Sequence, residues 1–446
     1  MSRKAHIRNI LILVVIAMGG GLWYLFTPDV AKLDIARMQG QTPDITQIRR
    51  ENFPTIQIAD VVGWKKGEMP TPAAGMKVTP FAADLAHPRN MLVLPNGDVL
   101  VAESNAPERA TQGVQDWIAK NLILKANAGG TSANRITLLR DADGNGVAEM
   151  RTVLVEGLNS PYGMALVKDQ LYIANTDAVR VYPYTLGQTK ITDPGKDVIP
   201  LPAQAPNNHW TRNLLHDVKG NRLYVTIGSN SNIGENGMES EEHRAQIKEL
   251  DLAKGRSSVF AYGLRNPTGL AFNPDTGTLW TSVNERDMLG SDGPPDYLTS
   301  VTFGTFYGWP YFYWGNQEDR RVKQDRMDLK QYSKRPDYAL GPHVAALGMT
   351  FNSGAGLGDS FARGAFVAQH GSWNRKPKSG YKVVFIPFTP QGFPPKDVKP
   401  VPILTGFLSK DEKTAFGRPA AVSIDSKGAL LVADDSGNMI WRVTKG

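Results

Sequence analysis

The same short sequence pattern recurs six times along this chain: an apolar run, a turn that contains Gly or Asp, and a second apolar run. The first copy reads MLVLPNGDVLVAES (residues 91–104) and the last reads VSIDSKGALLVADDS (residues 422–436). A unit of this kind cannot bury its own faces, so the copies are expected to pack side by side. The second apolar runs align on six residues that lie 52 to 86 positions apart, namely Val99, Leu171, Leu223, Leu279, Ala365 and Leu430.

Further strand candidates lie between these copies, at residues 134–141, 179–184, 247–252, 381–388 and 440–445. Six repeats of four strands each predict an all-β fold, a six-bladed β-propeller. The 44 Gly and 30 Pro of the chain suit such a turn-rich protein. A propeller is a scaffold with a central mouth, so its function has to be argued from the residues that line that mouth.

The N-terminus has the pattern of an export signal. Arg3, Lys4 and Arg8 are followed by residues 10–26, which carry no charge. Seventeen apolar residues are at the short limit for a membrane span, and no clear small-x-small cleavage site follows them. We therefore expect an uncleaved helical anchor that holds the propeller on the periplasmic side of the inner membrane. A cleaved signal peptide, which would leave a free periplasmic protein, is the alternative.

The chain is expected to divide into three parts. Residues 1–27 are the signal anchor or signal peptide, residues 28–75 a proline-punctuated stalk and extension, and residues 76–446 the propeller. The net charge of +7 includes three charges from the basic start, and no basic cluster with interleaved aromatic residues stands out. This pattern indicates no nucleic-acid partner. Because the chain has no Cys, disulfides and a lipid-anchored cysteine are both excluded.

Two insertions interrupt the rhythm of the strands. Residues 106–128 include VQDWIAKNLILK, which has helical periodicity, and residues 307–332 are rich in aromatic and charged side chains. Insertions in repeat proteins usually fall on one face, which is often the binding face. A separate motif, DADGNG at residues 141–146, has the oxygen spacing of a calcium loop. Its twelfth position is Thr152 instead of Glu, which disfavours an EF-hand and favours a tight hairpin turn.

A set of motifs follows in a fixed order: NNHWTRN (207–213), TIGSN (226–230), GLRNPTGLAF (263–272), NERD (284–287) and FYGWP (306–310). In this combination the chain resembles the quinoprotein aldose sugar dehydrogenases, which bind pyrroloquinoline quinone (PQQ), and is most similar to the L-sorbosone dehydrogenase branch. The resemblance runs from about Pro88 to the C-terminus. It implies a sugar substrate and the cofactors PQQ and Ca²⁺.

The resemblance also implies roles for individual residues. PQQ is a planar quinone with three carboxylates, so its site needs cations, and oxidation of a sugar hydroxyl needs a base. His209 matches the general base, and Arg265 matches the guanidinium that polarises the quinone, with Asn266 beside it. His370 and His216 are competing candidates for the base. Further cofactor-binding candidates are Arg418, Arg375, Lys378, Asn230 and Asp434. The family has a second arginine where this chain has Phe416.

For the metal, the resemblance implies main-chain carbonyls that follow the Asn-Glu dipeptide directly. The matching positions are Asp287 and Met288, where the family pattern is Gly-Pro. Main-chain ligation tolerates such a change, because Ca²⁺ needs oxygen atoms more than a particular side chain. Asp296 and Tyr307 match positions that serve an accompanying calcium ion in some members of the family.

Three functional hypotheses follow. The first is a quinoprotein dehydrogenase that oxidises an aldose or a sorbosone-like aldosone and passes electrons to a quinone or cytochrome partner. The second is a calcium-dependent lactonase-type hydrolase, whose metal would be held near the axis by Asn175, Asn230, Glu285 and Asp434. The third is a non-catalytic binding propeller, since propellers also serve as interaction scaffolds.

Overall fold

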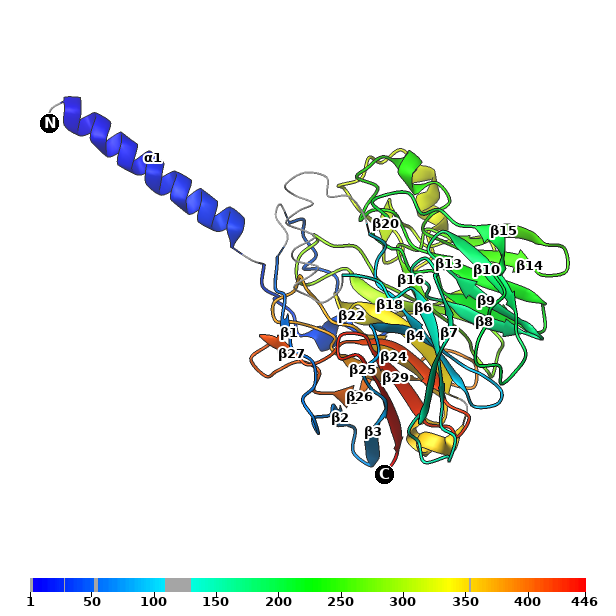
Figure 1. Cartoon of the computed structure of the whole chain (residues 1–446). Helices are drawn as coiled ribbons and strands as arrows, with labels where there is room; N and C mark the ends of the chain where they lie inside the picture. The colour runs from blue at the N-terminus through cyan, green and yellow to red at the C-terminus, as the bar shows by residue number, and fades with distance from the viewer. Residues whose placement is uncertain (1–2, 28, 52–54, 109–129, 353) are drawn as a thin grey trace.

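The structure, a computed structural model, describes residues 3–27, 29–51, 55–108, 130–352 and 354–446. Most of the predicted insertion at residues 106–128, including its helical pattern, lies outside the described residues. Six sheets of at least four strands form the blades of a propeller, and the prediction of a six-bladed all-β fold is confirmed (Figure 1). The residues on which the six repeats align all lie in the second strand of a blade.

The blades follow the chain in order. Blade one contains β4 (Pro88–Val93), β5 (Val99–Glu103), β6 (Arg135–Arg140) and β7 (Met150–Glu156). Blade two contains β8 (Met164–Val167), β9 (Gln170–Ala174), β10 (Ala178–Pro183) and β11 (Lys196–Pro200). Blade three contains β12 (Leu214–Asp217), β13 (Arg222–Ile227), β14 (Gln246–Asp251) and β15 (Arg256–Tyr262), which β19 (Thr305–Phe306) joins in parallel.

Blade four contains β16 (Pro267–Phe272), β17 (Leu279–Val283), β18 (Pro295–Val301) and β22 (Tyr338–Pro342). Blade five contains β23 (Ala346–Asn352), β24 (Gly364–Gln369), β25 (Lys382–Pro387) and β26 (Val401–Thr405), with β2 (Thr71–Pro72) at its edge. Blade six contains β28 (Pro419–Ile424), β29 (Leu430–Asp434), β30 (Met439–Lys445) and β3 (Met76–Ala82). A small hairpin pairs β20 (Phe312–Tyr313) with β21 (Gln317–Glu318).

The ring closes through the N-terminal strand. β3 pairs antiparallel with β30, from Met76 opposite Lys445 to Ala82 opposite Ile440, and so completes the last blade (Figure 1). The first strands of successive blades are neighbours around the axis, and β28 contacts β4. Every residue of β5, β17 and β24 is buried, because a second strand lies between two neighbouring blades. These strands therefore read as continuous apolar runs in the sequence.

The segment predicted as a stalk is bound to the propeller. Its 3₁₀ helix η1 (Ile35–Met38) packs against β22, and Gly40 and Ala339 exchange backbone hydrogen bonds of 2.9 and 2.8 Å. Further on, β1 (Asp60–Val61) pairs in parallel with β27 (Thr414–Ala415). In this segment, predicted as a stalk and extension, backbone groups thus bond to blades four to six. Residues 29–75 are called the extension below.

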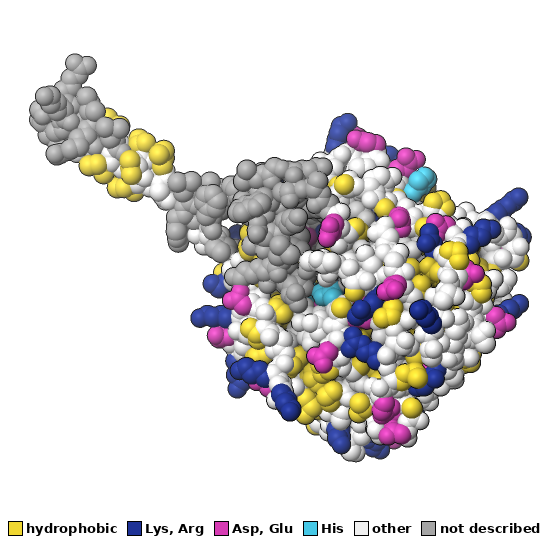
Figure 2. All heavy atoms as spheres, in the orientation of Figure 1, with side chains coloured by type: hydrophobic (Ala, Val, Ile, Leu, Met, Phe, Trp, Pro, Cys, Tyr) yellow, Lys and Arg dark blue, Asp and Glu magenta, His cyan; other side chains and the backbone are white. Residues whose placement is uncertain are grey.

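The predicted anchor falls within α1 (Arg3–Phe26), which projects from the propeller in Figure 1. Among the residues that the structure describes, no helix is long and apolar enough to cross a membrane. The side chains at residues 11 and 22–26 lie outside that description, so the anchor stays a prediction. On the face of the molecule in Figure 2, basic and acidic side chains are interspersed.

Candidate functional site

One face of the propeller collects most of the predicted site residues. The start of each first strand pairs with the end of the second strand, as Leu214 does with Val225 and Pro267 with Val283. The loops before the first strands and after the second strands therefore meet on the same side, which is called the mouth face here. Loops of blades three and four bring His209 and Arg265 there, together with the Asp287 loop.

His209 is held in one tautomer by Ser229. Its Nδ1 lies 2.9 Å from both the carbonyl oxygen and the hydroxyl oxygen of Ser229. Because the Ser229 hydroxyl donates to the carbonyl of Ser231 at 2.6 Å, its oxygen is left to accept from Nδ1–H. The proton is therefore on Nδ1, and Nε2 carries the lone pair. Nε2 has no hydrogen-bond partner in the part of the chain that the structure describes.

The surroundings keep His209 neutral. Burial lowers the pKa of the half-buried His209 well below its usual value of 6.5, and the positive charge of Arg265 lowers it further. A neutral imidazole with a free lone pair is able to accept a proton. Ser229 also links the two predicted catalytic residues, since its amide donates to the Arg265 carbonyl at 2.7 Å.

The guanidinium of Arg265 is turned toward the protein. It is 3% exposed and donates to the Glu285 carbonyl at 2.6 Å, the Asn232 side chain at 2.9 Å and the Asp287 carboxylate at 3.0 Å. Its Nε also donates to the Asn232 carbonyl at 3.2 Å. In this arrangement Arg265 ties the loops after β13 and β17 together. The predicted role, polarising a bound quinone, would require one of these hydrogen bonds to be exchanged.

Asn266 offers an unpaired acceptor beside His209. Its Oδ1 is buried and has no partner among the described residues. A Cβ placed on Gly228 would lie 2.5 Å from this oxygen and 2.5 Å from the His209 Cβ, so only glycine fits at that point. This contact gives a physical reason for the glycine of the TIG motif. A buried acceptor without a donor is costly, and a ligand that donates a hydrogen bond would satisfy it.

The two carbonyls predicted to bind calcium are already hydrogen-bonded. Arg321 Nη1 donates to the Asp287 carbonyl at 2.7 Å and to the Met288 carbonyl at 3.1 Å. The Glu51 amide of the extension also donates to Met288, at 3.1 Å. The Asp287 carboxylate accepts from Arg265 and, at 2.8 Å, from Asn374. As arranged, this donor set does not fit a calcium ion at the carbonyl pair.

Asp296 and Tyr307 do not share a site for an accompanying cation. Asp296 accepts the amides of Glu285 at 2.8 Å and Ala346 at 3.1 Å, and burial raises its pKa to about 7. The Tyr307 hydroxyl donates to the Ser300 carbonyl at 2.6 Å. Asp296 therefore links blade four to the start of blade five, and Tyr307 links the segment after β19 to β18 of blade four. The prediction that they serve a calcium ion is corrected by these bonds.

The basic residues predicted to bind the cofactor differ in how many hydrogen bonds their side chains already make within the protein. Arg418 donates to the carbonyls of His370 at 3.0 Å and Gly371 at 2.7 Å. Arg375 donates to the carbonyls of Ser291 at 2.8 Å and Pro377 at 2.7 Å. Both guanidiniums thus hold the backbone of neighbouring loops. The half-buried Lys378 has an ammonium group without a hydrogen-bond partner in the described structure, and burial lowers its pKa.

Asn230 and Asp434 are structural residues. The Asn230 side chain accepts the Asn207 amide at 2.7 Å, and both residues are buried. The Asp434 carboxylate accepts from the amides of Arg418 and Gly437 and from the indoles of Trp64 and Trp441, at 2.7 to 3.2 Å. Both side chains are thus engaged by N–H groups of the protein. Both were predicted as cofactor ligands and, in the lactonase hypothesis, as metal ligands, whereas in this structure both side chains bind protein groups.

The other two lactonase candidates are engaged as well. Asn175 accepts the Asn159 amide at 3.2 Å, and Glu285 pairs with the buried Arg286 at 2.9 Å. Among the described residues, the acidic group with metal-ligand spacing is Asp141, Asp143 and Glu149, in the DADGNG turn and directly before β7. There the ammonium of Lys427 donates to Asp141 at 2.9 Å and to the Gly144 carbonyl at 2.8 Å. The turn follows β6, whose end is on the side opposite the mouth face.

Neither competing histidine is placed to act as the base. His370 Nε2 is bound to both oxygens of Asp435 at 2.9 and 2.8 Å, and burial lowers its pKa to about 3. His216 lies in β12 and lines a cavity of about 530 Å³ to which the first strands of all six blades contribute. Since it is seven residues beyond His209 along the blade, it is at the far end of the first strand.

Sequence reasoning missed a buried charge cluster that joins three blades. Asp435 of blade six pairs with His370 of blade five and with Arg89 of blade one, and His87 lies 3.6 Å away. The Arg89 guanidinium lies over the ring of Trp210, the neighbour of His209, at 5.6 Å. The sequence signal that could have found this cluster is the position of its residues, because each lies near the start of a first strand or the end of a second strand.

The extension crosses the mouth face. Arg49 donates its amide to the Leu289 carbonyl at 3.1 Å, and Gln57 donates to the Trp373 carbonyl at 2.7 Å. Trp64 packs on Phe416 with ring centroids 5.6 Å apart. Phe416, the position where the family has an arginine, is therefore a docking surface for the extension. The phenylalanine at position 416 thus packs against Trp64 of the extension.

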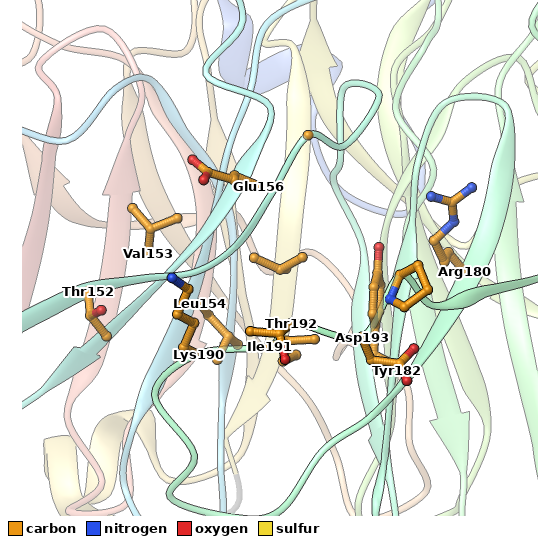
Figure 3. Close-up of a pocket in the computed structure, with 13 residues that line it drawn as sticks. Thr152, Val153, Leu154, Glu156, Arg180, Tyr182, Lys190, Ile191, Thr192 and Asp193 are labelled. Carbon is orange, nitrogen blue, oxygen red and sulfur yellow. The ribbon is translucent and has the colours of Figure 1, made fainter.

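A second cavity lies away from this face. It has a volume of about 480 Å³ and lies between the outer strands of blades one and two (Figure 3). Glu156, Arg180, Tyr182 and Lys190 line it. None of the predicted site residues contributes to it.

Comparison with known proteins places the chain in a family. A family profile described as TrAA12-like matches residues 70–295 and 311–446. The chain belongs to the TrAA12-like family. The matched residues include the loops of His209 and Arg265, whereas most of the extension lies outside them.

Relatives and solved structures of this TrAA12-like chain agree with that assignment. It is 30% identical to an uncharacterized protein of Borreliella burgdorferi over 65% of this chain and 77% of that protein. It is 26% identical to an aldose sugar dehydrogenase of Escherichia coli over 36% of this chain and 46% of the relative. It is also 26% identical to a PQQ-dependent pyranose dehydrogenase of Coprinopsis cinerea over 40% of this chain and 30% of the relative. The chain thus spans less than half of these two sugar dehydrogenases.

The fold match is broader than the sequence match. A calcium structure of the Trichoderma reesei Family AA12 enzyme superposes with a TM-score of 0.68 at 20% identity, covering 84% of this chain and 97% of that chain. The holo form of the PQQ domain of Coprinopsis cinerea pyranose dehydrogenase gives 0.67 at 20% identity, covering 87% and 100%. The cofactors in these two structures match the PQQ and Ca²⁺ that the motifs imply.

Proposed function

We propose that this TrAA12-like protein is a PQQ-dependent dehydrogenase that oxidises a hydroxyl group of a sugar. The observation that carries the proposal is His209, a neutral imidazole on the mouth face whose Nε2 is free while Ser229 fixes Nδ1. The names of its relatives, an aldose sugar dehydrogenase and a PQQ-dependent pyranose dehydrogenase, support it. No described contact of His209 gives it a competing structural role at Nε2.

The residues of this chain have defined tasks in such a reaction. His209 Nε2 would accept the hydroxyl proton of the sugar, and Ser229 would stabilise the resulting imidazolium through Nδ1–H. PQQ, when bound, supplies the hydride acceptor. The unpartnered ammonium of Lys378 would bind a carboxylate of such an anionic planar cofactor. The unpaired buried Oδ1 of Asn266 would accept a hydrogen bond from an N–H or O–H group of a bound ligand.

The finer assignments rest on the resemblance. We propose an aldose or sorbosone-like aldosone as the substrate and a quinone or cytochrome as the electron acceptor. We also propose that residues 10–26 anchor the chain, with the propeller on the periplasmic side. The basic start and the uncharged apolar segment support this arrangement. A chain that begins at Asp29 should then be soluble, and recovery of the full-length chain in the soluble fraction would contradict the anchor.

The test combines cofactor binding with turnover. Purified protein is mixed with PQQ, and the thermal midpoint is measured, since a ligand that binds only the folded state raises it. Turnover is then measured with an artificial electron acceptor and a panel of aldoses and aldosones. His209→Ala should leave the PQQ shift intact and lower turnover about 10²- to 10⁴-fold. The matched control is His216→Ala, at the far end of the same blade, which should turn over like the wild type. Absence of any PQQ shift, or full turnover by His209→Ala, would refute the proposal.

A further inference from the structure

Arg321 occupies the position at which the motifs place a metal ion. It lies just beyond β21, in the insertion of blade four, and its Nη1 donates to both carbonyls of the Asp287–Met288 pair. The other side of the guanidinium forms a two-point ion pair with Asp319, with Nε at 2.8 Å and Nη2 at 2.7 Å. Four of its five N–H groups are thereby directed at fixed oxygens, in the planar geometry that suits arginine and not lysine.

The position of Arg321 is fixed by a buried network. The Asp319 side chain is fully buried and also accepts from Arg286 at 3.4 Å. Arg286, itself fully buried, donates to the carbonyls of Pro310 and Phe312 at 2.8 Å each. Removing the Arg321 side chain from Asp319 would leave a buried carboxylate with only the Arg321 amide at 3.1 Å and the Arg286 guanidinium at 3.4 Å among the partners described, which is unfavourable. The guanidinium is therefore a permanent part of the mouth face.

Three carboxylates around the carbonyl pair are already paired with arginines. Asp287 pairs with Arg265, Glu285 with Arg286, and Asp319 with Arg321. Ca²⁺ requires six to eight oxygen ligands and favours carboxylates with free lone pairs. Here the carbonyls of Asp287 and Met288 accept from Arg321, and both oxygens of the Asp287 carboxylate accept from protein N–H groups. A divalent ion would add two positive charges beside these three ion pairs, where the Glu51 carboxylate of the extension also interacts electrostatically with Asp287.

We propose that Arg321 replaces the divalent ion at the Asp287–Met288 carbonyls, so that this chain binds its quinone cofactor without a metal at that position. The proposal rests on the proposed function, because it concerns the PQQ site. A guanidinium places a positive charge near a carboxylate or quinone oxygen, as a bound cation does, and the remaining N–H of Arg321 can donate one hydrogen bond to it. The Met288 carbonyl gains its second donor from Glu51, so the extension seals the same position.

The first arm of the test needs no PQQ. Terbium luminescence reports lanthanide uptake at calcium sites, and it is measured in an Asp143→Asn background to silence the acidic turn of Asp141, Asp143 and Glu149. The protein with Arg321 intact should show no saturable signal, whereas Arg321→Ser should gain one, because the carbonyls and Asp319 are freed. The adjacent, exposed Arg320 provides the matched control, and Arg320→Ser should remain silent. A saturable signal with Arg321 intact, abolished by excess calcium, would overturn the proposal.

The second arm uses the wild-type chain with PQQ. The dissociation constant of the wild type for PQQ should agree within about twofold between EGTA and calcium. In EGTA, Arg321→Ser should bind PQQ at least about tenfold more weakly than the wild type, and added calcium should restore its PQQ affinity. Loss of PQQ binding by the wild type in EGTA alone would overturn the proposal without any variant. If PQQ does not bind under any condition, the proposed function fails, and the terbium arm still decides whether Arg321 excludes a metal.

Discussion

Replacing Trp64 by phenylalanine should release the extension from the mouth face. The Trp64 indole donates to the buried Asp434 carboxylate at 2.7 Å, and its ring packs against Phe407, Phe416 and Trp441 at 5.4 to 5.6 Å between centroids. Phenylalanine keeps most of the ring contact and removes the donor. Asp434 Oδ2 would then retain only the Trp441 indole, at 3.2 Å.

The size of the effect follows from the burial of Asp434. Leaving a buried acceptor with an unmet hydrogen bond costs about 1–3 kcal/mol, so we expect a loss of about 2 kcal/mol in the free energy of unfolding. Burial raises the pKa of Asp434 from 3.8 to about 6. Because the indole stabilises the charged form, its removal raises this pKa further. The loss should therefore be larger above pH 6, where the carboxylate is charged, than near pH 4, where it is protonated.

The measurement is urea unfolding followed by circular dichroism at pH 4.5 and pH 8, since tryptophan fluorescence changes with the substitution itself. Trp373→Phe is the matched control, because Trp373 lies on the same face and its side chain is exposed. Its midpoint should stay close to that of the wild type. A Trp64→Phe loss no larger than that of Trp373→Phe, or one that does not change with pH, would refute the role given to the indole.

Three further predictions address the site and its surroundings. Ser229→Ala removes one of two acceptors at His209 Nδ1 and keeps the backbone carbonyl, so kcat should fall about 2- to 10-fold with little change in the PQQ dissociation constant. An unchanged kcat would contradict the role given to the Ser229 hydroxyl. The pKa of His370 is lowered from 6.5 to about 3 in the folded state, so protonation of His370 opposes folding as the pH falls below 6.5. Between pH 6.5 and pH 5, the free energy of unfolding of His370→Gln should therefore fall by about 2 kcal/mol less than that of the wild type, as measured by urea unfolding. Equal losses would contradict the lowered pKa. Asp296→Asn places an amide N–H against a backbone N–H, which should lower the free energy of unfolding by about 1–3 kcal/mol. The response of the thermal midpoint to calcium should not change. A lost calcium response would restore Asp296 as a metal ligand.

The fold was predictable because one strand in each blade has a distinctive environment. Second strands such as β5 and β24 are buried on both sides, and so they appear as continuous apolar runs with a regular spacing. The outer strands have no such signal, since three of the seven residues of β7 and five of the seven residues of β15 are exposed at the rim, and neither strand was predicted. The third strand of blade four, β18, was also missed, because it begins with Pro-Asp directly after a Gly- and Pro-rich turn.

The sequence by itself determined the periodicity of the chain and the place of His209, which its motif puts directly before a first strand. Only the tertiary structure decided what each polar side chain binds. Arg321 is 33 residues from the Met288 carbonyl, and Trp64 is 370 residues from Asp434. Hydrophobic periodicity records whether a residue is buried, which is a local property of a strand. Hydrogen bonds between loops depend on which blade ends meet around the axis, and closure of the ring fixes that arrangement.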